Sequence, residues 1–404
     1  MTRRTVAALG SLSPAVLLAS TGRAPQSKPR IGAVVSEYRW YSHADVICGR
    51  VLDGYSANGI WTPSRMQLVA VHTDQIPAND MSRDMAARAG FKICPTIADA
   101  LTAATGKLAV DGVLFICELG DYPRNADGQK LYPRFEQFSQ ILDIYEAAGR
   151  GVPTFFDKHF SYDWTKAEKL FQRARRLRFP LMAGSSAPLG PRTHDYFPEL
   201  ETPMTAAAAI GNGAIEDYGF HLLEVAQSLI ERRKGGETGI AEVEYISGSD
   251  IWQWCDSARG AWSKPLLEAA HFAAPDPRPS RLEDAKDAAL FRLRYNDGFQ
   301  LAAIQIPEAD PARKVAIRIP GRAAPVSTAF DVRVGRPLPH FDGLVHCIDE
   351  MMNTGKEPYP PERTLLTTGA LALCFDAKRA RQALDTPQLN IRYRAVENTY
   401  YQTH

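Results

Sequence analysis

The chain has almost no excess charge of either sign. Its 404 residues contain 47 lysines and arginines against 46 aspartates and glutamates, which gives a formal net charge of +1. Proteins that bind nucleic acid usually carry a basic face, so this balance predicts no nucleic-acid or polyanionic partner. With 45% hydrophobic residues, the chain has enough apolar side chains to build two domain cores.

Long hydrophobic runs are also missing. The most apolar stretch near the N-terminus, "VAALGSLSPAVLLAS", is interrupted by Gly10 and Pro14. A membrane-spanning helix needs about 20 consecutive apolar residues. We therefore expect no integral membrane segment in the mature chain.

Cysteine and histidine occur without metal-binding spacing. The six cysteines are scattered and form no C-x-x-C pair, and the histidines form no H-x-H or H-E-x-x-H motif. Zinc sites usually show such spacings, so we predict no metal. Mostly apolar neighbours predict that the cysteines are buried free thiols rather than a disulfide framework.

The N-terminus carries a pair of arginines, Arg3 and Arg4, followed by the weakly apolar stretch. This order is typical of a twin-arginine export signal, here residues 1–29, and predicts a periplasmic or extracytoplasmic protein. An irregular N-terminus of a cytoplasmic protein is the alternative. The twin-arginine route exports folded proteins, often after a cofactor has been inserted.

Residues 30–185 alternate short apolar runs with helical patterns. Buried strands are predicted at 30–35, 66–73, 110–117 and 153–157, and again at "PLMAGSS" (180–186). Strands without polar alternation, separated by helices, indicate a parallel sheet that is covered on both faces. We therefore predict an α/β fold that begins with a Rossmann-like, doubly wound domain.

From residue 186 the pattern changes. Alternating strands at 240–248, 289–306 and 314–321 include a hairpin signal, "NDG", at 296–298. They predict a C-terminal α+β domain, residues 186–404, with an open and mainly antiparallel sheet. Two helical stretches, "GLVHCIDEMMNTG" and "RTLLTTGALALCFDAKRA", close the chain.

The octapeptide "DYGFHLLE" contains three polar residues that a helix places along one face: Asp217, His221 and Glu224. Apolar residues cover much of the rest of this helix, so the polar stripe fits the lining of a cleft. Taken alone, the pattern is equally typical of a solvated or internally hydrogen-bonded histidine.

Three segments together resemble the glucose-fructose oxidoreductase, inositol dehydrogenase and MocA-like family over residues 30–385. "PTFFDKHFSYDW" resembles the family's strand that ends in Glu-Lys-Pro, here Asp157-Lys158-His159. "GAIEDYGFHLLE" resembles its G-x-x-x-D-x-G-x-H-x-x-D helix, and the last two helical stretches resemble its closing helices. In this family a Rossmann domain precedes an open sheet that carries the substrate site and often the oligomer contact.

The resemblance implies a carbohydrate or polyol as the small-molecule substrate, and a homo-oligomer formed through the C-terminal sheet. Lys158 and His221 would be the catalytic acid-base groups, and Asp217 would bind or orient the reacting hydroxyl. His159 and Glu224 would contact the substrate. A histidine has an unperturbed pKa near neutrality, which suits proton transfer at a hydroxyl.

The cofactor motif departs from the family. Members that bind NAD or NADP have G-x-G-x-x-G after the first strand, whereas this chain has "RIGAVVSEYRWYSHADV". The positions that would serve a dinucleotide are Gly32, Arg39, Thr73 and Asp74. After the third strand, Glu118, Asp121 and Tyr122 replace the usual small residues and would contact substrate.

Two functions therefore remain open. The first is an NAD- or NADP-dependent oxidoreductase that acts on a sugar or polyol. The second is a non-redox carbohydrate-active enzyme (lyase, hydratase or hydrolase), or a sugar-binding protein, on a Rossmann scaffold that has lost the dinucleotide. Aromatic rings stack on sugar faces, so Tyr38, Trp40 and Tyr41 fit the second function better.

Overall fold

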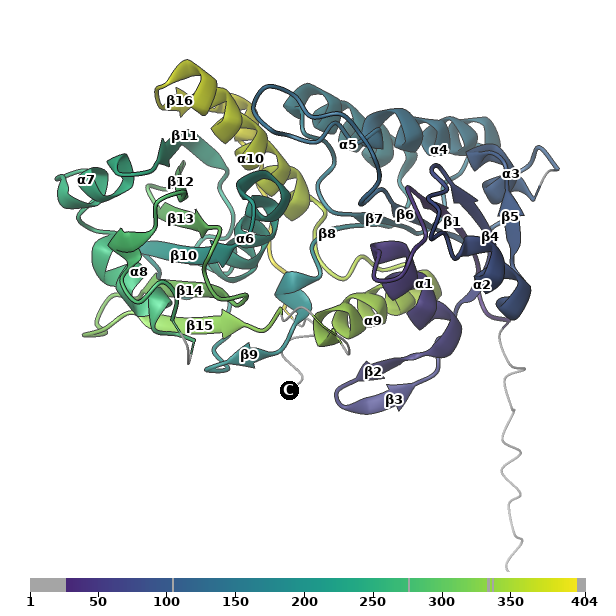
Figure 1. Ribbon diagram of the computed structural model, residues 1–404, viewed down its shortest axis with the longest axis horizontal. Helices are drawn as coiled ribbons and strands as arrows, with labels where there is room; N and C mark the ends of the chain where they lie inside the picture. Colours follow the sequence, from purple (N-terminus) through teal and green to yellow (C-terminus); the bar gives the residue numbers. More distant parts are fainter. Residues whose placement is uncertain (1–26, 104, 275–276, 333–334, 336–337, 398–404) are drawn as a thin grey trace, which may run out of the picture.

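The computed structural model describes residues 27–103, 105–274, 277–332, 335 and 338–397 (Figure 1). The described chain forms two domains, each built around one large sheet. The predicted export signal, residues 1–29, lies outside the described residues except for its last three positions. No helix in the described part of the chain is long and apolar enough to cross a membrane.

The N-terminal sheet has six parallel strands, in the order β5-β4-β1-β6-β7-β8. The strand order reverses at β1, which confirms the predicted doubly wound sheet. The central strands are almost fully buried because helices cover both faces. The strands are β1 (Arg30–Val35), β4 (Gln67–Thr73), β5 (Lys92–Cys94), β6 (Gly112–Ile116), β7 (Thr154–Asp157) and β8 (Leu181–Gly184).

Helices of this domain begin where side chains cap them. Ser42, Thr96 and Asp163 each accept a hydrogen bond from a backbone N–H in the first turn of the helix that follows. Gly90 ends one helix in the left-handed conformation, at φ 79°. The helices are α1 (His43–Asp53), α2 (Ser82–Ala89), α3 (Ile97–Thr102), α4 (Arg134–Ala148) and α5 (Trp164–Leu177).

One closing helix, α9 (Pro339–Thr354), packs in the core of the N-terminal domain. Its residues Phe341, Leu344 and Ile348 share an apolar cluster with α1 and one face of the parallel sheet, while α3, α4 and α5 cover the other face. A short hairpin of β2 (Tyr55–Ala57) and β3 (Ile60–Thr62) lies beside α9 (Figure 1).

The C-terminal sheet has eight strands, in the order β16-β11-β12-β13-β10-β14-β15-β9. Only β10 and β13 pair in parallel, so the sheet is mainly antiparallel as predicted. The predicted turn at 296–298 joins β12 to β13, with Gly298 at φ 86°. The strands are β9 (Arg192–Thr193), β10 (Ala206–Asn212), β11 (Ile240–Ser247), β12 (Ala289–Tyr295), β13 (Gln300–Ile306), β14 (Arg313–Arg318), β15 (Val326–Phe330) and β16 (Leu384–Asp385).

Helices cover both faces of this sheet. The predicted helices α6 (Ile215–Ile230) and α10 (Glu362–Ala380) pack on one face. Two helices that the sequence did not predict, α7 (Asp250–Asp256) and α8 (Lys264–His271), pack on the other. The sheet is therefore open at its edges, whereas its faces are occupied.

Candidate functional site

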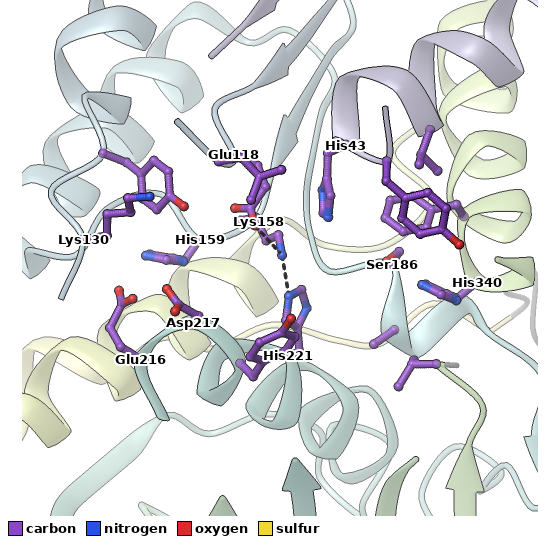
Figure 2. Close-up of a pocket in the computed structure, with 18 of the residues that line it drawn as sticks. His43, Glu118, Lys130, Lys158, His159, Ser186, Glu216, Asp217, His221 and His340 are labelled. Atoms are coloured by element: carbon purple, nitrogen blue, oxygen red, sulfur yellow. Dashed lines mark hydrogen bonds and ion pairs between the residues drawn. The ribbon is translucent and has the colours of Figure 1, made fainter. Parts of the chain in front are cut away.

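A cavity of about 360 Å³ lies between the two domains, where the carboxyl ends of β6 and β7 face the first half of α6. Figure 2 shows its polar side chains pointing toward a common space. In doubly wound folds, ligands bind at this carboxyl edge of the sheet. The labelled lining residues are His43, Glu118, Lys130, Lys158, His159, Ser186, Glu216, Asp217, His221 and His340.

Lys158 follows directly after β7 and has a left-handed backbone, at φ 71°. Its N–H donates to the Gly184 carbonyl oxygen at 3.1 Å, which fixes this conformation. A non-glycine residue at positive φ costs roughly 1–2 kcal/mol. The turn directs Nζ toward α6, where it lies 2.5 Å from His221 Nε2 and 3.3 Å from Glu118 Oε1.

His221 is held from both sides of its ring. Its Nδ1 lies 2.5 Å from the Ser185 hydroxyl, and its Nε2 lies beside Lys158. Burial, followed by the charge of Lys158, holds the pKa of His221 well below its ordinary value. The neutral ring therefore has one N–H and one lone pair, and it shares a hydrogen-bonded proton with Lys158. The pair predicted from the sequence meets in one cavity.

The two acidic residues at the start of α6 lie at the other end of the cavity. The Asp217 carboxylate is 3.1 Å from Arg124 Nη2. Burial, together with a hydrogen bond and the charge from Asp217, raises the pKa of Glu216 to about 8. Glu216 is therefore mainly protonated at neutral pH, and it is a lining residue that the sequence did not single out.

Glu224 does not line the cavity, which corrects its predicted role in substrate binding. Three residues beyond His221, its side chain is turned toward α10, where Thr367 Oγ1 donates to it at 2.6 Å. It also accepts from the Ser185 N–H at 3.3 Å. Burial raises the pKa of this carboxyl group, against the opposing charge of Arg363. Glu224 thus positions Ser185, which in turn contacts His221.

A second pair of acid-base groups, a histidine with a carboxylate, faces the same cavity. His43, at the start of α1, has its Nδ1 2.6 Å from Asp157 Oδ2 at the end of β7. The carboxylate accepts the Nδ1 proton, so Nε2 is the atom left for other contacts. The ring packs edge-on against Phe341. His43 was not predicted, because its partner is 114 positions away in the chain.

His159 lines the cavity beside a buried arginine. Arg134 Nη1 lies 2.9 Å from His159 Nε2, and Arg134 also contacts Glu118 at 3.4 Å. Burial and the two neighbouring cations, Arg134 and then Lys158, hold the pKa of His159 well below its ordinary value. The predicted substrate contacts His159 and Glu118 are therefore both at the cavity, joined through an arginine that the sequence did not identify.

The turn after β1 is filled by its own side chains. Tyr38 is fully buried in the apolar core, and its carbonyl oxygen accepts from the Met81 N–H at 2.7 Å. Arg39 Nε donates to Glu37 at 2.5 Å. Of the three aromatic residues predicted to stack on sugar, only Tyr41 lines the cavity, while Trp40 is exposed.

Gly32 lies inside β1 rather than in the turn, which corrects its predicted place in a cofactor motif. A Cβ at this position would meet the Ala100 carbonyl oxygen at 3.1 Å. Glycine is therefore needed here for the packing of α3 against the strand, and not for the approach of a phosphate.

Hydrogen bonds join the carboxyl ends of β4, β1 and β6, across which a dinucleotide lies in Rossmann folds. The Ser36 hydroxyl donates to the Glu118 carbonyl oxygen at 2.5 Å. The Tyr122 hydroxyl donates to Asp74 at 2.7 Å, and the Asp121 N–H donates to Gln75 at 2.8 Å. Neither Asp121 nor Tyr122 lines the cavity, and their predicted contact with substrate stays a prediction.

The described residues do not fit NAD or NADP in the usual pose. Asp74, at the position of a ribose-binding acid, is occupied by Tyr122, and Arg39 is paired with Glu37. Thr73 is buried at the end of β4. Within the described ranges, no group of three or more His, Cys, Asp or Glu residues has the geometry to hold a metal ion.

Comparison with known proteins shows that the fold of this chain is similar to the folds of several solved structures. No protein-family model and no curated protein matches the chain. A myo-inositol dehydrogenase from Corynebacterium glutamicum ATCC 13032 is 12% identical and has a TM-score of 0.54, over 89% of this chain and 98% of that one. GenD2 from gentamicin A biosynthesis, solved with NAD, is 14% identical with a TM-score of 0.57, over 93% and 99%.

A third similar structure is an oxidoreductase from Agrobacterium radiobacter in complex with NAD⁺, L-tartaric acid and magnesium. It is 10% identical with a TM-score of 0.54, over 89% of this chain and 98% of that one. The chain thus has the two-domain fold of these proteins, two of which were solved with NAD, and the predicted fold is confirmed.

Proposed function

We propose that this chain is a non-redox enzyme, a lyase or hydratase, that acts on a carbohydrate or polyol in the cavity between the domains. The observation that carries the proposal is that two acid-base pairs, Lys158–His221 and His43–Asp157, face one cavity while hydrogen bonds cross the dinucleotide crevice. A fold of this kind hosts several chemistries, so the function is argued from the site.

The two pairs suit the removal of water across a carbon–carbon bond. One pair takes the proton from a C–H group, and the electrons of that bond form a C=C bond. The neighbouring hydroxyl leaves with a proton from the other pair, as water. The protons and electrons balance without an oxidant or reductant, and addition of water is the reverse reaction. General acid and base groups each contribute about 10²–10⁴-fold to such steps.

The second candidate is an NAD- or NADP-dependent oxidoreductase that acts on the same class of substrate. The similar structures that hold NAD favour it. Binding in the usual pose would require the turn after β1 and the loop after β6 to separate, which breaks the contacts of Ser36, Gln75 and Asp74 with that loop.

Two measurements separate these candidates. Purified protein is denatured and the supernatant is searched for nicotinamide by absorbance and mass, and native protein is titrated with NAD and NADP by calorimetry. We expect no released dinucleotide and no binding at millimolar cofactor. Stoichiometric dinucleotide by either route would reject the non-redox proposal.

Proton transfer is tested directly in deuterium oxide. The protein is incubated with a panel of sugars, polyols and sugar acids, and NMR follows the exchange of carbon-bound hydrogen and the loss of water. We expect His221→Ala and Lys158→Ala each to slow the reaction by at least ~100-fold, while Glu308→Gln on the exposed surface has no effect. Near-normal rates in both cavity variants would show that the assigned groups are wrong.

Export through the twin-arginine route and action in the periplasm belong to the same proposal, and the sequence "RRTVAAL" supports them. A homo-oligomer formed through the C-terminal sheet stays a prediction. Since α7 and α8 cover one face of that sheet and α6 and α10 the other, the contact would use its edges or the outer sides of these helices.

A further inference from the structure

A buried arginine of the C-terminal sheet lines the cavity, and no carboxylate among the described residues forms an ion pair with it. Arg313 begins β14 and is only 3% exposed. Its Nη1 donates to the neutral Asn212 side chain and to the Pro311 carbonyl oxygen. Its Nε is buried without a hydrogen-bond acceptor among the described residues. The nearby carboxylate of Asp310 binds Lys314 instead.

Three other buried arginines of the described chain are paired with carboxylates. Arg363 lies 2.6 Å from Glu231, Arg233 lies 2.9 Å from Glu237, and Arg134 lies 3.4 Å from Glu118. A buried charge without a counter-ion is strongly unfavourable, and a bound anion would neutralise it. Burial lowers the pKa of Arg313 to about 10, and the guanidinium therefore still carries its charge at neutral pH.

The cavity as a whole is positively charged. Five cationic side chains line it, against three carboxylic acids, of which Glu216 is mainly protonated at neutral pH. Three of the four lining histidines, His159, His221 and His340, are held neutral by burial and by the cations around them. The lining cations are Arg124, Lys130, Arg134, Lys158 and Arg313. An excess of positive charge in a partly enclosed site favours an anionic ligand.

We propose that Arg313 is an anion subsite that binds the carboxylate of a sugar acid. This inference rests on the proposed function and names its substrate class. A guanidinium matches a planar carboxylate through paired N–H donors. Arg313 lies 5.5 Å from the Tyr218 ring, which is partly exposed beside the cavity and offers a face for the sugar carbon skeleton.

The position of the arginine also suits the chemistry. Arg313, Lys158 and His221 line the same cavity, so the subsite and the acid-base pair face one bound substrate. Neutralising a carboxylate makes the neighbouring C–H group easier to deprotonate. A substrate whose carboxylate binds Arg313 would thus present its adjacent carbon to the acid-base pair.

Calorimetry tests the subsite with defined probes. The parent protein, Arg313→Gln and Arg313→Lys are titrated with hexuronates and aldonates, with the matching neutral hexoses, and with hexose phosphates. We expect at least one sugar acid to bind the parent at least ~10-fold more tightly than its neutral counterpart, the scale of a charge-assisted hydrogen-bond pair. Arg313→Gln should abolish that preference, and Arg313→Lys should keep part of it.

Arg318→Gln, on the same strand, is the control and should leave the preference intact, and circular dichroism confirms that each variant folds. If Arg313→Gln does not fold, Arg313→Lys provides the test of the subsite. Loss of bidentate binding in this variant must still lower the affinity for the sugar acid more than the affinity for the hexose. Equal affinity for acid and hexose, preference for hexose phosphate, or unchanged acid binding in the folded Arg313 variants would overturn the subsite.

The same titrations in a His221→Ala background measure the binding of sugar acids when a proposed acid-base group is absent. Together with proton exchange by the parent, they separate the subsite from the proposed function. Binding of a sugar acid without proton exchange by the parent would leave the subsite in place and reject the lyase or hydratase. Proton exchange on neutral sugars, with no preference for sugar acids, would leave the lyase or hydratase in place and reject the subsite.

Discussion

At the scale of single residues, the cavity concentrates groups whose protonation differs from that in water. Glu216 is 8% exposed, and its pKa of about 8 is raised first by burial. In the unfolded chain the same carboxyl group ionises near its ordinary value of 4.5. The folded protein therefore retains a proton that the unfolded chain releases as the pH rises.

The stability of the parent protein should consequently fall between about pH 4.5 and pH 8, and Glu216→Gln should remove that part of the fall. We expect the variant to gain on the order of 1–3 kcal/mol relative to the parent between pH 5 and pH 8.5, measured by urea unfolding at each pH. The control is Glu308→Gln, whose side chain is exposed. A stability difference that is constant across this pH range would show that the pKa of Glu216 is not raised by folding.

Lys158 combines a chemical role with an unusual backbone, and two substitutions separate them. Alanine removes Nζ and keeps the strained φ of 71°, whereas glycine removes Nζ and relieves the strain. We expect the free energy of unfolding of Lys158→Gly to be about 1 kcal/mol higher than that of Lys158→Ala. Both variants should lose proton-exchange activity. Equal stability of the two variants would show that the left-handed conformation costs nothing here.

At the scale of elements, replacing a helical glycine by alanine should have opposite effects on stability at two positions. Nothing lies within 4 Å of a Cβ built on Gly49 in α1, whereas a Cβ on Gly369 in α10 would meet Trp164 Cζ3 at 2.7 Å and also Leu389. Gly49→Ala should stabilise the protein by ~0.5–1 kcal/mol through helix propensity. Gly369→Ala should destabilise it by ~1–3 kcal/mol through overpacking.

Thermal and urea unfolding measure both glycine variants against the parent. Each variant serves as the control for the other, since the chemical change is identical and only the surroundings differ. Stabilisation by Gly369→Ala would mean that α10 does not pack closely against α5 and the segment near Leu389.

The elements that sequence patterns predicted are those with a strong local signal. Apolar runs between capped helices predicted the parallel sheet, and "NDG" predicted the turn between β12 and β13. The strand β10 was missed because "AAAAIGN" contains four alanines, which have low strand propensity. Small side chains suit it because α6 packs on one of its faces and α8 on the other.

Most of the predicted residues that line the cavity lie in recognisable motifs, and Glu118 was predicted from its place after a strand. Lys158, Asp217 and His221 lie in segments with a recognisable order of residues, and all three line the cavity. His43 and Arg313 come from distant parts of the chain and become neighbours of these residues only through the tertiary fold. Asp121 and Tyr122 were predicted to contact substrate, but neither lines this cavity; the Asp121 N–H donates to Gln75 and the Tyr122 hydroxyl donates to Asp74.

At the scale of the whole molecule, the chain returns to its first domain near its end. Helix α9 completes the core of the parallel sheet, and α10 packs against α5 and α6. A buried ion pair, Arg363 with Glu231 at 2.6 Å, links α10 to the end of α6. The cavity walls therefore belong to one continuously packed body, so the site forms only when the full chain has folded.

This dependence on complete folding bears on where the protein acts. All six cysteines are buried and free, so none of the described core requires an oxidising compartment. A protein that finishes folding in the cytoplasm is a suitable cargo for a route that exports folded chains. We propose that such a route recognises the arginine pair at Arg3 and Arg4, ahead of a weakly apolar stretch.

Replacing Arg3 and Arg4 together by lysine keeps the charge and the apolar stretch, and changes only the paired guanidinium groups. We expect the variant to accumulate, folded, in the cytoplasm, while the parent reaches the periplasm with a mature chain that begins beyond about residue 20, as mass spectrometry of the fractionated protein would show. Arg23→Lys, in the same segment but outside the pair, is the matched control and should be exported normally. Export of the double variant at the parent's level would reject the twin-arginine assignment, because charge and hydrophobicity alone would then suffice.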